Sequence, residues 1–234
     1  MNDLYYLLSR YLPEFLLGMK TTATVSVFGF LLAFVIGLIG AAARESRSRI
    51  AASIAGVYVE IIRNTPMLLQ VFIIYFGLPS VGLKFSNYHA AIIALGISGG
   101  GYLIEIFRAG FAALPRGQRE AASTLGLSRR DTYFYVLLPQ AMRIVYPPTV
   151  GQFLQMVLGS SLLSVIGLTE LTGQAQLVSE ETFMSMPAFI IALFGYLILT
   201  NLISLCSSIA GRFLFSPPLH VLQGGTKSFR GLLG

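Results

Sequence analysis

The sequence is poor in charge and in the residues that most catalytic and metal sites use. Only 11% of its 234 residues are charged and 55% are apolar, whereas about a quarter of an ordinary soluble domain is charged. The single cysteine, Cys206, excludes a disulfide within the chain and is expected to pack as a small apolar residue. His89 and His220 are far apart and have no Cys or Asp at ligand spacing, so no metal site is predicted. This composition indicates a membrane protein.

The groups that catalysis needs are equally scarce. No Ser or Cys can be paired with a His at a credible position, and no carboxylate pair forms a recognisable site. Residues 224–228, Gly-Gly-Thr-Lys-Ser, fail the phosphate-binding P-loop pattern because Thr, not Gly, precedes the Lys. We therefore predict that the chain is not an enzyme, and that any ATP it depends on is hydrolysed by another chain.

The formal net charge of +6 comes from short basic clusters beside apolar runs. That pattern is typical of cytoplasmic loops and contact with anionic lipid, and it leaves no basic face for nucleic acid. Lys and Arg concentrate in residues 44–49, 116–143 and 212–230, against one Lys in the opposite loops. The positive-inside rule then predicts an outside N-terminus and a cytoplasmic C-terminus. The N-terminal residues include acidic side chains and no basic leading region, so no cleavable signal peptide is expected.

Five apolar segments are long enough to cross a bilayer. The first, residues 21–43, holds 23 uncharged residues, and a helix that rises about 1.5 Å per residue crosses a core of about 30 Å with about 20 of them. The others cover about residues 50–76, 89–114, 148–168 and 183–213. The sequence therefore predicts an all-α integral membrane protein with five transmembrane helices.

Three regions follow from this pattern. Residues 2–15 are predicted to form a short amphipathic helix that lies at the membrane interface and is broken by Pro13. We expect an N-terminal interfacial helix over residues 1–15, a transmembrane domain over 16–215 and a cytoplasmic tail over 216–234.

Two of the predicted spans carry helix-breaking or small residues. Pro66 lies in the middle of the second span, where it removes a backbone donor and should kink or open the helix. The third span has Gly96, Gly99, Gly100 and Gly101 near its middle. These glycines permit either close contact with another helix or local unwinding.

The longest polar stretch, residues 115–139, is patterned as two short helices. Pro115 suits a first helical turn, and Gly126 stands where a left-handed residue would stop the helix. Ser128 and Asp131 form a capping-box pattern that opens a second helix, which Pro139 is expected to help end. A punctuated polar insert of this kind between apolar spans indicates a surface that binds a partner.

The same stretch resembles the EAA loop of bacterial ABC importer permeases. The match consists of Glu120-Ala121-Ala122, three further residues, Gly126, nine further residues, Val136, and Leu138-Pro139. In that family the short helix is the coupling helix, which sits in a groove of the cytoplasmic ATPase subunit. The resemblance implies ATPase-coupling roles for Glu120, Ala121, Ala122, Gly126, Leu127 and Pro139.

Further motifs are similar to the polar amino acid branch of these permeases. They are Tyr102–Glu105, Phe107-Arg108, Gly117-Gln118, Arg63-Asn64-Thr65-Pro66 and Val165–Thr172, and the likeness covers roughly residues 15–215. One departure stands in the fourth span, where relatives often have a Lys-Asn/Ser-Thr-Ser-Leu run and this chain has Leu158-Gly159-Ser160-Ser161-Leu162. Without the Lys, this run leaves the charge type of the substrate open.

The resemblance implies a type I ABC importer permease in the bacterial cytoplasmic (inner) membrane. It would carry a polar amino acid, with cationic ones such as arginine or histidine among the candidates. The partners implied are two copies of an ABC ATPase, an extracytoplasmic substrate-binding protein, and a second permease that is either this chain again or a sister chain. No cofactor is expected in this chain, because ATP and Mg²⁺ would be bound by the ATPase.

Charged and polar side chains within the spans are candidates for the substrate pathway. Glu60 with Arg63, and Glu105 with Arg108, are spaced i,i+3 on one helix face. Ionised side chains near the bilayer centre cost roughly 3 kcal/mol each, so each pair either meets the charged groups of an amino acid or neutralises itself near the cytoplasmic side. Weaker candidates in the fourth span are Gln152, Gln155, Ser160 and Ser161.

Two other functions remain open from the residues. The paired charges and the broken second span also suit an ion-coupled secondary transporter, although no internal repeat is evident. A non-transporting assembly subunit would leave the intramembrane charges without a purpose.

Overall fold

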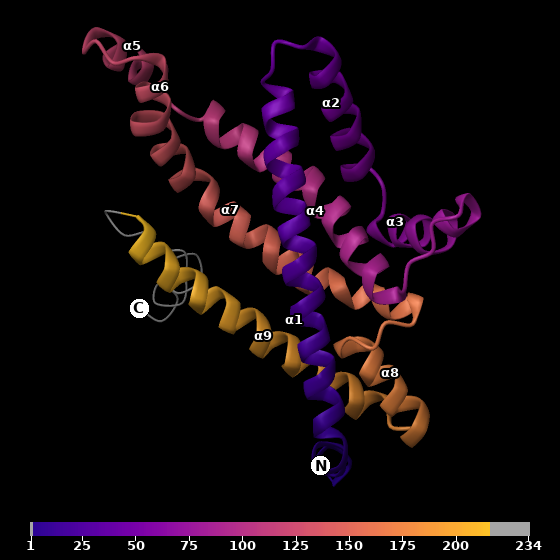
Figure 1. Ribbon diagram of the computed structural model, residues 1–234. Helices are drawn as coiled ribbons and strands as arrows, with labels where there is room; N and C mark the ends of the chain where they lie inside the picture. Colours follow the sequence, from indigo (N-terminus) through magenta and orange to yellow (C-terminus); the bar gives the residue numbers. More distant parts are fainter. Residues whose placement is uncertain (1, 216–234) are drawn as a thin grey trace, which may run out of the picture. The chain divides into compact units, whose positions relative to one another are not determined.

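The computed structural model describes residues 2–215, and every element in that range is helical. Figure 1 shows the order of the helices along the chain. The predicted tail, with His220 and residues 224–228, lies outside the described residues. The longer helices are α1 (Asn2–Arg44), α2 (Arg49–Arg63), α4 (Asn87–Ala112), α5 (Arg116–Thr124), α7 (Leu138–Gly159), α8 (Leu171–Thr182) and α9 (Ser185–Leu214). Shorter ones are α3 (Met67–Phe72), α6 (Arg129–Asp131), the π-helices η1 (Ile73–Gly77) and η3 (Thr132–Leu137), and the 3₁₀ helices η2 (Leu78–Val81) and η4 (Ser160–Ile166).

The chain divides into two compact units. The first consists of Met1–Glu105 with Gln152–Thr200, and the second of Ile106–Gly151 with Asn201–Gly234. The first unit therefore holds the break in the second span and the segment from η4 to Thr200 of α9, whereas the second unit holds the polar stretch with α5.

Four helical stretches in the described residues are long and apolar enough to cross a membrane. They are Asp3–Arg44, Asn87–Ala112, Arg129–Ile166 and Ser185–Leu214. A fifth span results if the bent pair Arg49–Arg63 and Met67–Val81 is one crossing. The all-α membrane fold is thus confirmed, and the prediction of five spans agrees with this count when the bent pair is taken as one.

Pro13 does not break the first helix, so that prediction is wrong. α1 runs without interruption from Asn2 to Arg44 with the proline inside it. The lost backbone bond costs about 3 kcal/mol in a helix interior, but buried side chains hold the helix on both sides of the proline. Leu7 and Phe15 are 0% and 2% exposed in one apolar cluster with residues of α8 and α9. That residues 2–15 lie at the membrane interface stays a prediction.

The second span is broken where the sequence predicted. α2 ends at Arg63, Pro66 stands before the first residue of α3, and the two helical parts differ in direction by 109°. Pro66 has φ −60° and ψ 135°, an extended conformation that cannot continue a helix.

The glycines of α4 serve close packing and not local unwinding, because α4 is continuous through them. A Cβ added to Gly100 would lie 2.6 Å from Ile36 Cγ2, and one added to Gly99 would lie 2.6 Å from Met156 Sδ. The Tyr58 hydroxyl donates to the Ile97 carbonyl at 2.6 Å and ties α2 to the same part of α4. Only a hydrogen in place of a side chain lets α1 and α7 approach α4 this closely.

Pro139 does not end a helix, which corrects a second expectation. It is the second residue of α7 in a helical run from Arg129 to Ile166, so the fourth span begins well before residue 148. The π-helix η3 precedes it, and the Leu138 amide bonds to the Tyr133 carbonyl, five residues back. A wide turn of this kind shifts the hydrogen-bond register next to a residue that has no N–H, and the helix continues.

A further helix, α8, fills most of the stretch between the fourth and fifth predicted spans. Its first turn is capped by the Glu170 carboxylate, which accepts from the amides of Thr172 and Gly173. Its end is marked by Phe183, whose φ of +57° is left-handed.

Candidate functional site

The predicted coupling helix is present as α5, and its ends form as the sequence indicated. Pro115 precedes it with φ −59°, and Gly126 follows it with φ +75°. The Leu127 amide bonds to the Ala122 carbonyl at 3.1 Å, and the Gly126 amide bonds to the Ser123 carbonyl at 3.0 Å. This pair of bonds is the Schellman motif, which satisfies carbonyls at a helix end.

The faces of α5 differ in exposure. Glu120, Ala121, Gly126 and Leu127 are exposed, whereas the Ala122 side chain is only 3% exposed and packs within its own unit. Pro139 is exposed in α7 and not part of α5. Most of the predicted ATPase-coupling residues therefore lie on an open surface, and Ala122 lies on the packed side.

Direct contacts link α5 to the membrane helix that follows it. The Gln140 side-chain amide donates to Gln118 Oε1 of α5 at 3.3 Å and to the Val136 carbonyl at 2.8 Å. Ser128 caps α6 as predicted, because the Asp131 amide donates to Ser128 Oγ at 3.1 Å, and the Asp131 carboxylate accepts from the Ser128 hydroxyl at 2.6 Å. A side-chain hydrogen bond therefore joins α5 directly to α7.

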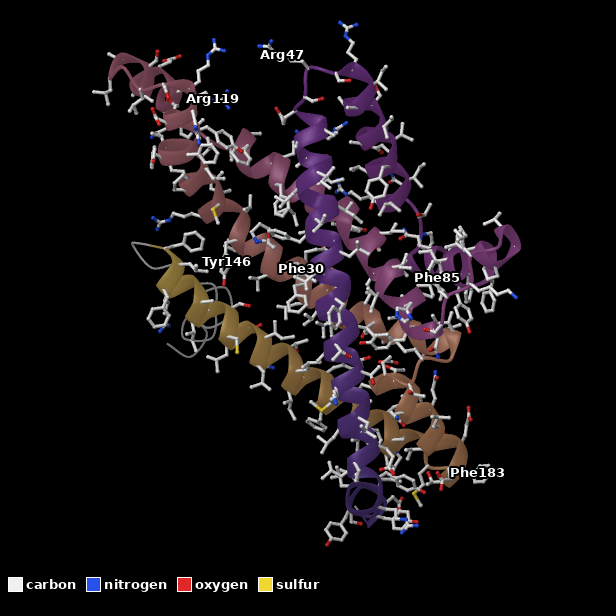
Figure 2. The ribbon with its side chains drawn as sticks, in the orientation of Figure 1. Phe30, Arg47, Phe85, Arg119, Tyr146 and Phe183 are labelled. Atoms are coloured by element: carbon white, nitrogen blue, oxygen red, sulfur yellow. The ribbon has the colours of Figure 1, made fainter. Side chains whose placement is uncertain are left out.

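Other contacts hold the second unit together. The Tyr146 hydroxyl of α7 donates to the Ser207 carbonyl of α9 at 2.6 Å, and Phe111 stacks on Tyr133 with ring centroids 5.7 Å apart. Figure 2 shows Tyr146 on α7 and Arg119 on α5.

Side chains at the break of the second span satisfy the carbonyls that the break leaves free. Asn64 Nδ2 donates to the Glu60 carbonyl at 2.8 Å and to Glu60 Oε2 at 3.0 Å. The Thr65 hydroxyl donates to the Ile61 carbonyl at 2.8 Å. Gln70, only 7% exposed, donates its amide to the Ile62 carbonyl at 2.9 Å. The sequence Arg-Asn-Thr-Pro followed by Gln70 thus encodes a polar cap for α2.

The predicted pathway charges occupy separate places in the first unit. The Arg63 guanidinium lies over the Tyr102 ring, 5.6 Å from its centroid, while the Glu60 carboxylate accepts from Asn64. Glu105 is 3.7 Å from Arg44 at the end of α1. The structure brings Glu60, Arg63 and Pro66 together at the break, and it places Glu105 with an arginine of another helix.

A pocket of about 460 Å³ opens between η4, α8 and α9 in the first unit. Its polar lining consists of hydroxyl groups, and its apolar lining comes mainly from α9. Ser161, Thr172, Tyr196 and Thr200 supply the hydroxyls, beside Leu158, Phe189, Ala192, Leu193 and Leu197. Of the four candidates in the fourth span, Ser161 lines this pocket, and Gln152, Gln155 and Ser160 do not.

Ser160, the residue before Ser161, belongs to η4, the helix that forms one side of this pocket. Ser160 is fully buried and donates to the Val157 carbonyl at 2.8 Å, and the Ser161 hydroxyl donates to the Leu158 carbonyl at the same distance. The part of α7 that precedes η4 packs against α1, where Phe30 and Phe153 have ring centroids 4.8 Å apart. Figure 2 labels Phe30 on α1.

Behind the pocket lies a buried carboxylate, that of Glu170, with 0% exposure. Its Oε2 accepts from the Tyr196 hydroxyl at 2.5 Å, the Thr172 amide at 2.9 Å and the Thr22 hydroxyl at 3.4 Å, and its Oε1 accepts from the Gly173 amide at 2.8 Å. Burial raises the pKa of the Glu170 carboxyl above its ordinary value, and the four hydrogen bonds, each of which acts to lower it, offset only part of this rise. The group joins α1, α8 and α9 at one point.

The comparisons with known proteins agree with the fold. The profile of the family described as binding-protein-dependent transport system inner membrane component matches residues 29–214. The chain belongs to this family. The glutamine transport system permease protein GlnP of Escherichia coli (strain K12) is 37% identical over 195 residues, which cover 82% of this chain and 89% of that one. The probable glutamine ABC transporter permease protein GlnM of Bacillus subtilis (strain 168) is 37% identical over 183 residues, or 78% of this chain and 85% of that one.

A solved structure is similar over most of both chains. An amino acid ABC transporter crystallised with histidines matches with a TM-score of 0.83 and 32% sequence identity, covering 88% of this chain and 96% of that one. The predicted type I ABC importer permease of the amino-acid kind is thereby confirmed, as is its place in the inner membrane. Neither an ion-coupled transporter nor an assembly subunit is favoured by these relatives.

Two polar residues of this permease were missed as site candidates in the sequence. Gln70 stands four residues after Pro66, a spacing that could have suggested a side chain replacing the missing proline donor. Glu170 gave a weaker signal, because its partners Thr22 and Tyr196 are 148 and 26 residues away along the chain.

Proposed function

We propose that this permease imports a polar amino acid, driven by ATP that a separate ATPase subunit binds with Mg²⁺ and hydrolyses. The observation that carries the proposal is α5, an exposed, capped helix tied by Gln118 and Gln140 to α7. In this scheme the ATPase groove receives α5 at Glu120 and Ala121. Closure of two ATPase subunits moves the helix, and α7 passes the movement to the membrane segments.

The assembly that this mechanism needs contains more than one permease. Two copies of this chain, or this chain and a sister permease, would each present one coupling helix to one ATPase subunit. An extracytoplasmic binding protein would deliver the substrate on the opposite side. The basic clusters at residues 44–49 and 116–143 support a cytoplasmic α1–α2 turn and a cytoplasmic α5, with the N-terminus outside and the C-terminus inside.

The pocket between η4, α8 and α9 is the proposed place for the amino acid within this chain. Its volume of about 460 Å³ falls in the range usual for small-molecule sites, about 300–1,000 Å³. Hydroxyl groups from Ser161, Thr172 and Thr200 can hydrogen-bond a polar substrate without a fixed charge. The relatives named for glutamine make L-glutamine the first amino acid to test.

The test is uptake by the complex reconstituted in liposomes with its ATPase and binding protein. We expect ATP-dependent uptake of at least one of L-glutamine, L-arginine, L-histidine, L-glutamate and L-cystine. The ATPase should also co-purify with the permease from membranes. Uptake driven by an ion gradient without ATP, or a permease that carries no ATPase, would contradict the proposal.

A further inference from the structure

The Glu170 carboxylate does not line the α8–α9 pocket, but it bonds to two residues that do. The Tyr196 hydroxyl and the Thr172 amide both donate to its Oε2. We propose that Glu170 is a positioning residue that makes the polar end of this pocket a hydrogen-bond acceptor, so that the pocket selects the ammonium group of an amino acid. This inference rests on the proposed transport function.

The donors around Glu170 favour its ionised form. Four hydrogen bonds converge on the two oxygens, and a backbone amide faces each of them, Thr172 at Oε2 and Gly173 at Oε1. A backbone N–H can only donate, so it cannot receive the proton of a neutral carboxyl. A carboxylate that accepts several such bonds is stabilised in its charged state.

The directions of these hydrogen bonds determine where the hydroxyl hydrogens at this end of the pocket point. A tyrosine hydroxyl has one hydrogen, and in Tyr196 that hydrogen is directed at Glu170. The Thr172 hydroxyl, 3.0 Å from the Tyr196 oxygen, must then supply its own hydrogen to that contact. Both oxygens keep lone pairs and have no hydrogen left for a ligand, so this end of the pocket can accept hydrogen bonds but cannot donate them.

A ligand group that fits such an end carries N–H donors and positive charge. The ammonium group of an amino acid has both. Its carboxylate has neither, and it would be repelled by the Glu170 carboxylate, which lies directly behind the lining residues to which it is hydrogen-bonded. None of the nine residues that line the pocket is charged, so no other side chain in the lining competes for the ammonium group. Phe189, Leu193 and Leu197 leave the remaining space to the apolar part of the substrate.

The experiment is direct binding to the transporter complex, purified from membranes with its ATPase and without the binding protein. The probes are L-glutamine and 4-carbamoylbutyrate, which lacks only the α-amino group. If the wild-type complex takes up arginine instead, the pair is L-arginine and 5-guanidinopentanoate. The variant is Glu170→Gln, and the matched control is Glu180→Gln, an exposed carboxylate on the same helix.

We expect Glu170→Gln to weaken binding of the amino acid about tenfold or more, because the negative charge is lost and the Tyr196 hydroxyl is no longer held with its oxygen free to accept from the ligand. Binding of the deaminated probe should change less than about twofold, since it makes no contact that depends on Glu170. Glu180→Gln should bind both probes as the wild type does. Equal weakening of both probes, or unchanged amino acid binding in Glu170→Gln, would overturn the inference.

Glu170 also caps α8, so a second variant guards against misfolding. Tyr196→Phe keeps the carboxylate and its two backbone bonds and removes only the hydroxyl that faces the pocket. It should lose the preference for the amino acid over the deaminated probe, and an unchanged preference would overturn the inference. If the wild-type complex takes up no amino acid at all, the proposed function fails. If uptake is normal and both variants keep the preference, only the role of Glu170 fails.

Discussion

The side-chain amide of Gln70 donates a hydrogen bond to the Ile62 carbonyl at 2.9 Å, and thereby replaces the donor that Pro66 lacks. In an unbroken helix the amide of residue 66 would bond to that carbonyl. Gln70 also donates to the Thr65 carbonyl at 3.2 Å and to the Thr65 hydroxyl at 3.0 Å. The side-chain amide of Gln70 therefore holds the two parts of this 109° joint together, while its Oε1 is buried without a hydrogen-bond partner among the described residues.

The first prediction concerns this joint. Gln70→Met keeps the length of the side chain and removes the amide, which leaves a buried carbonyl without a partner. Such a loss costs about 1–3 kcal/mol, so the thermal unfolding midpoint of the purified permease should fall. Uptake should fall with it, because α3 contacts η4 beside the proposed pocket, where Met67 approaches Gly159.

The matched control is Ser26→Ala on α1. Ser26 is fully buried and its hydroxyl has no hydrogen-bond partner among the described residues. Removing it should change stability by less than about 0.5 kcal/mol or raise it slightly. Equal midpoints for Gln70→Met and the wild type would show that the amide does not hold the joint.

The second prediction concerns the partner surface of α5. Glu120→Lys reverses an exposed charge where the ATPase is proposed to bind, and should lower ATPase affinity at least tenfold. Co-purification of the ATPase and substrate-stimulated ATP hydrolysis measure the effect. Glu45→Lys, the same charge change at the exposed turn between α1 and α2, should leave both normal. Normal stimulated hydrolysis in Glu120→Lys would remove the coupling role from this loop.

The third prediction separates backbone conformation from space at two glycines of the loop. Neither Gly117 nor Gly126 has any atom within 4 Å of an added Cβ, but only Gly126 has a positive φ, +75°. Gly126→Ala should cost about 1–2 kcal/mol, because a left-handed residue with a Cβ is strained. Gly117→Ala, within α5, should be neutral or stabilise by up to about 1 kcal/mol.

Thermal midpoints of the two glycine variants provide the comparison, with ATP-driven uptake as the functional readout. Gly126→Asn should recover part of the loss, since Asn tolerates the left-handed region better than Ala. Equal stability of the alanine variants would mean that the turn after α5 relaxes, and that its Schellman motif does not fix the helix end.

The sequence predicted both ends of α5 correctly, because the residues that cap a helix lie within a few positions of its ends. Whether a proline breaks its helix was harder to predict, since nothing in the sequence distinguishes Pro13, Pro66 and Pro139 in this respect. Pro66 breaks its helix where Asn64, Thr65 and Gln70 can satisfy the free carbonyls. Pro13 is overridden by packing against α8 and α9, and Pro139 by a π-turn.

The Glu170 site could not be predicted for a related reason. A buried carboxylate is acceptable only when distant donors converge on it, and Thr22 and Tyr196 come from two other helices. Periodicity and spacing identify the helices but not which hydroxyls meet between them. For the same reason nothing in the sequence indicated that Arg44 of α1 lies beside Glu105.

The last prediction tests whether the charge at the break takes part in transport. Glu60→Gln keeps an oxygen that can accept from Asn64 Nδ2, now at 3.0 Å, and removes only the negative charge. If Glu60 meets the substrate on its path, uptake should fall at least tenfold while the thermal midpoint and ATPase association stay normal. Glu105→Gln is the matched comparison, because Glu105 contacts Arg44 and its loss should lower the thermal midpoint. Normal uptake in Glu60→Gln would assign Glu60 to capping α2 alone, since the cap needs the oxygen but not the charge.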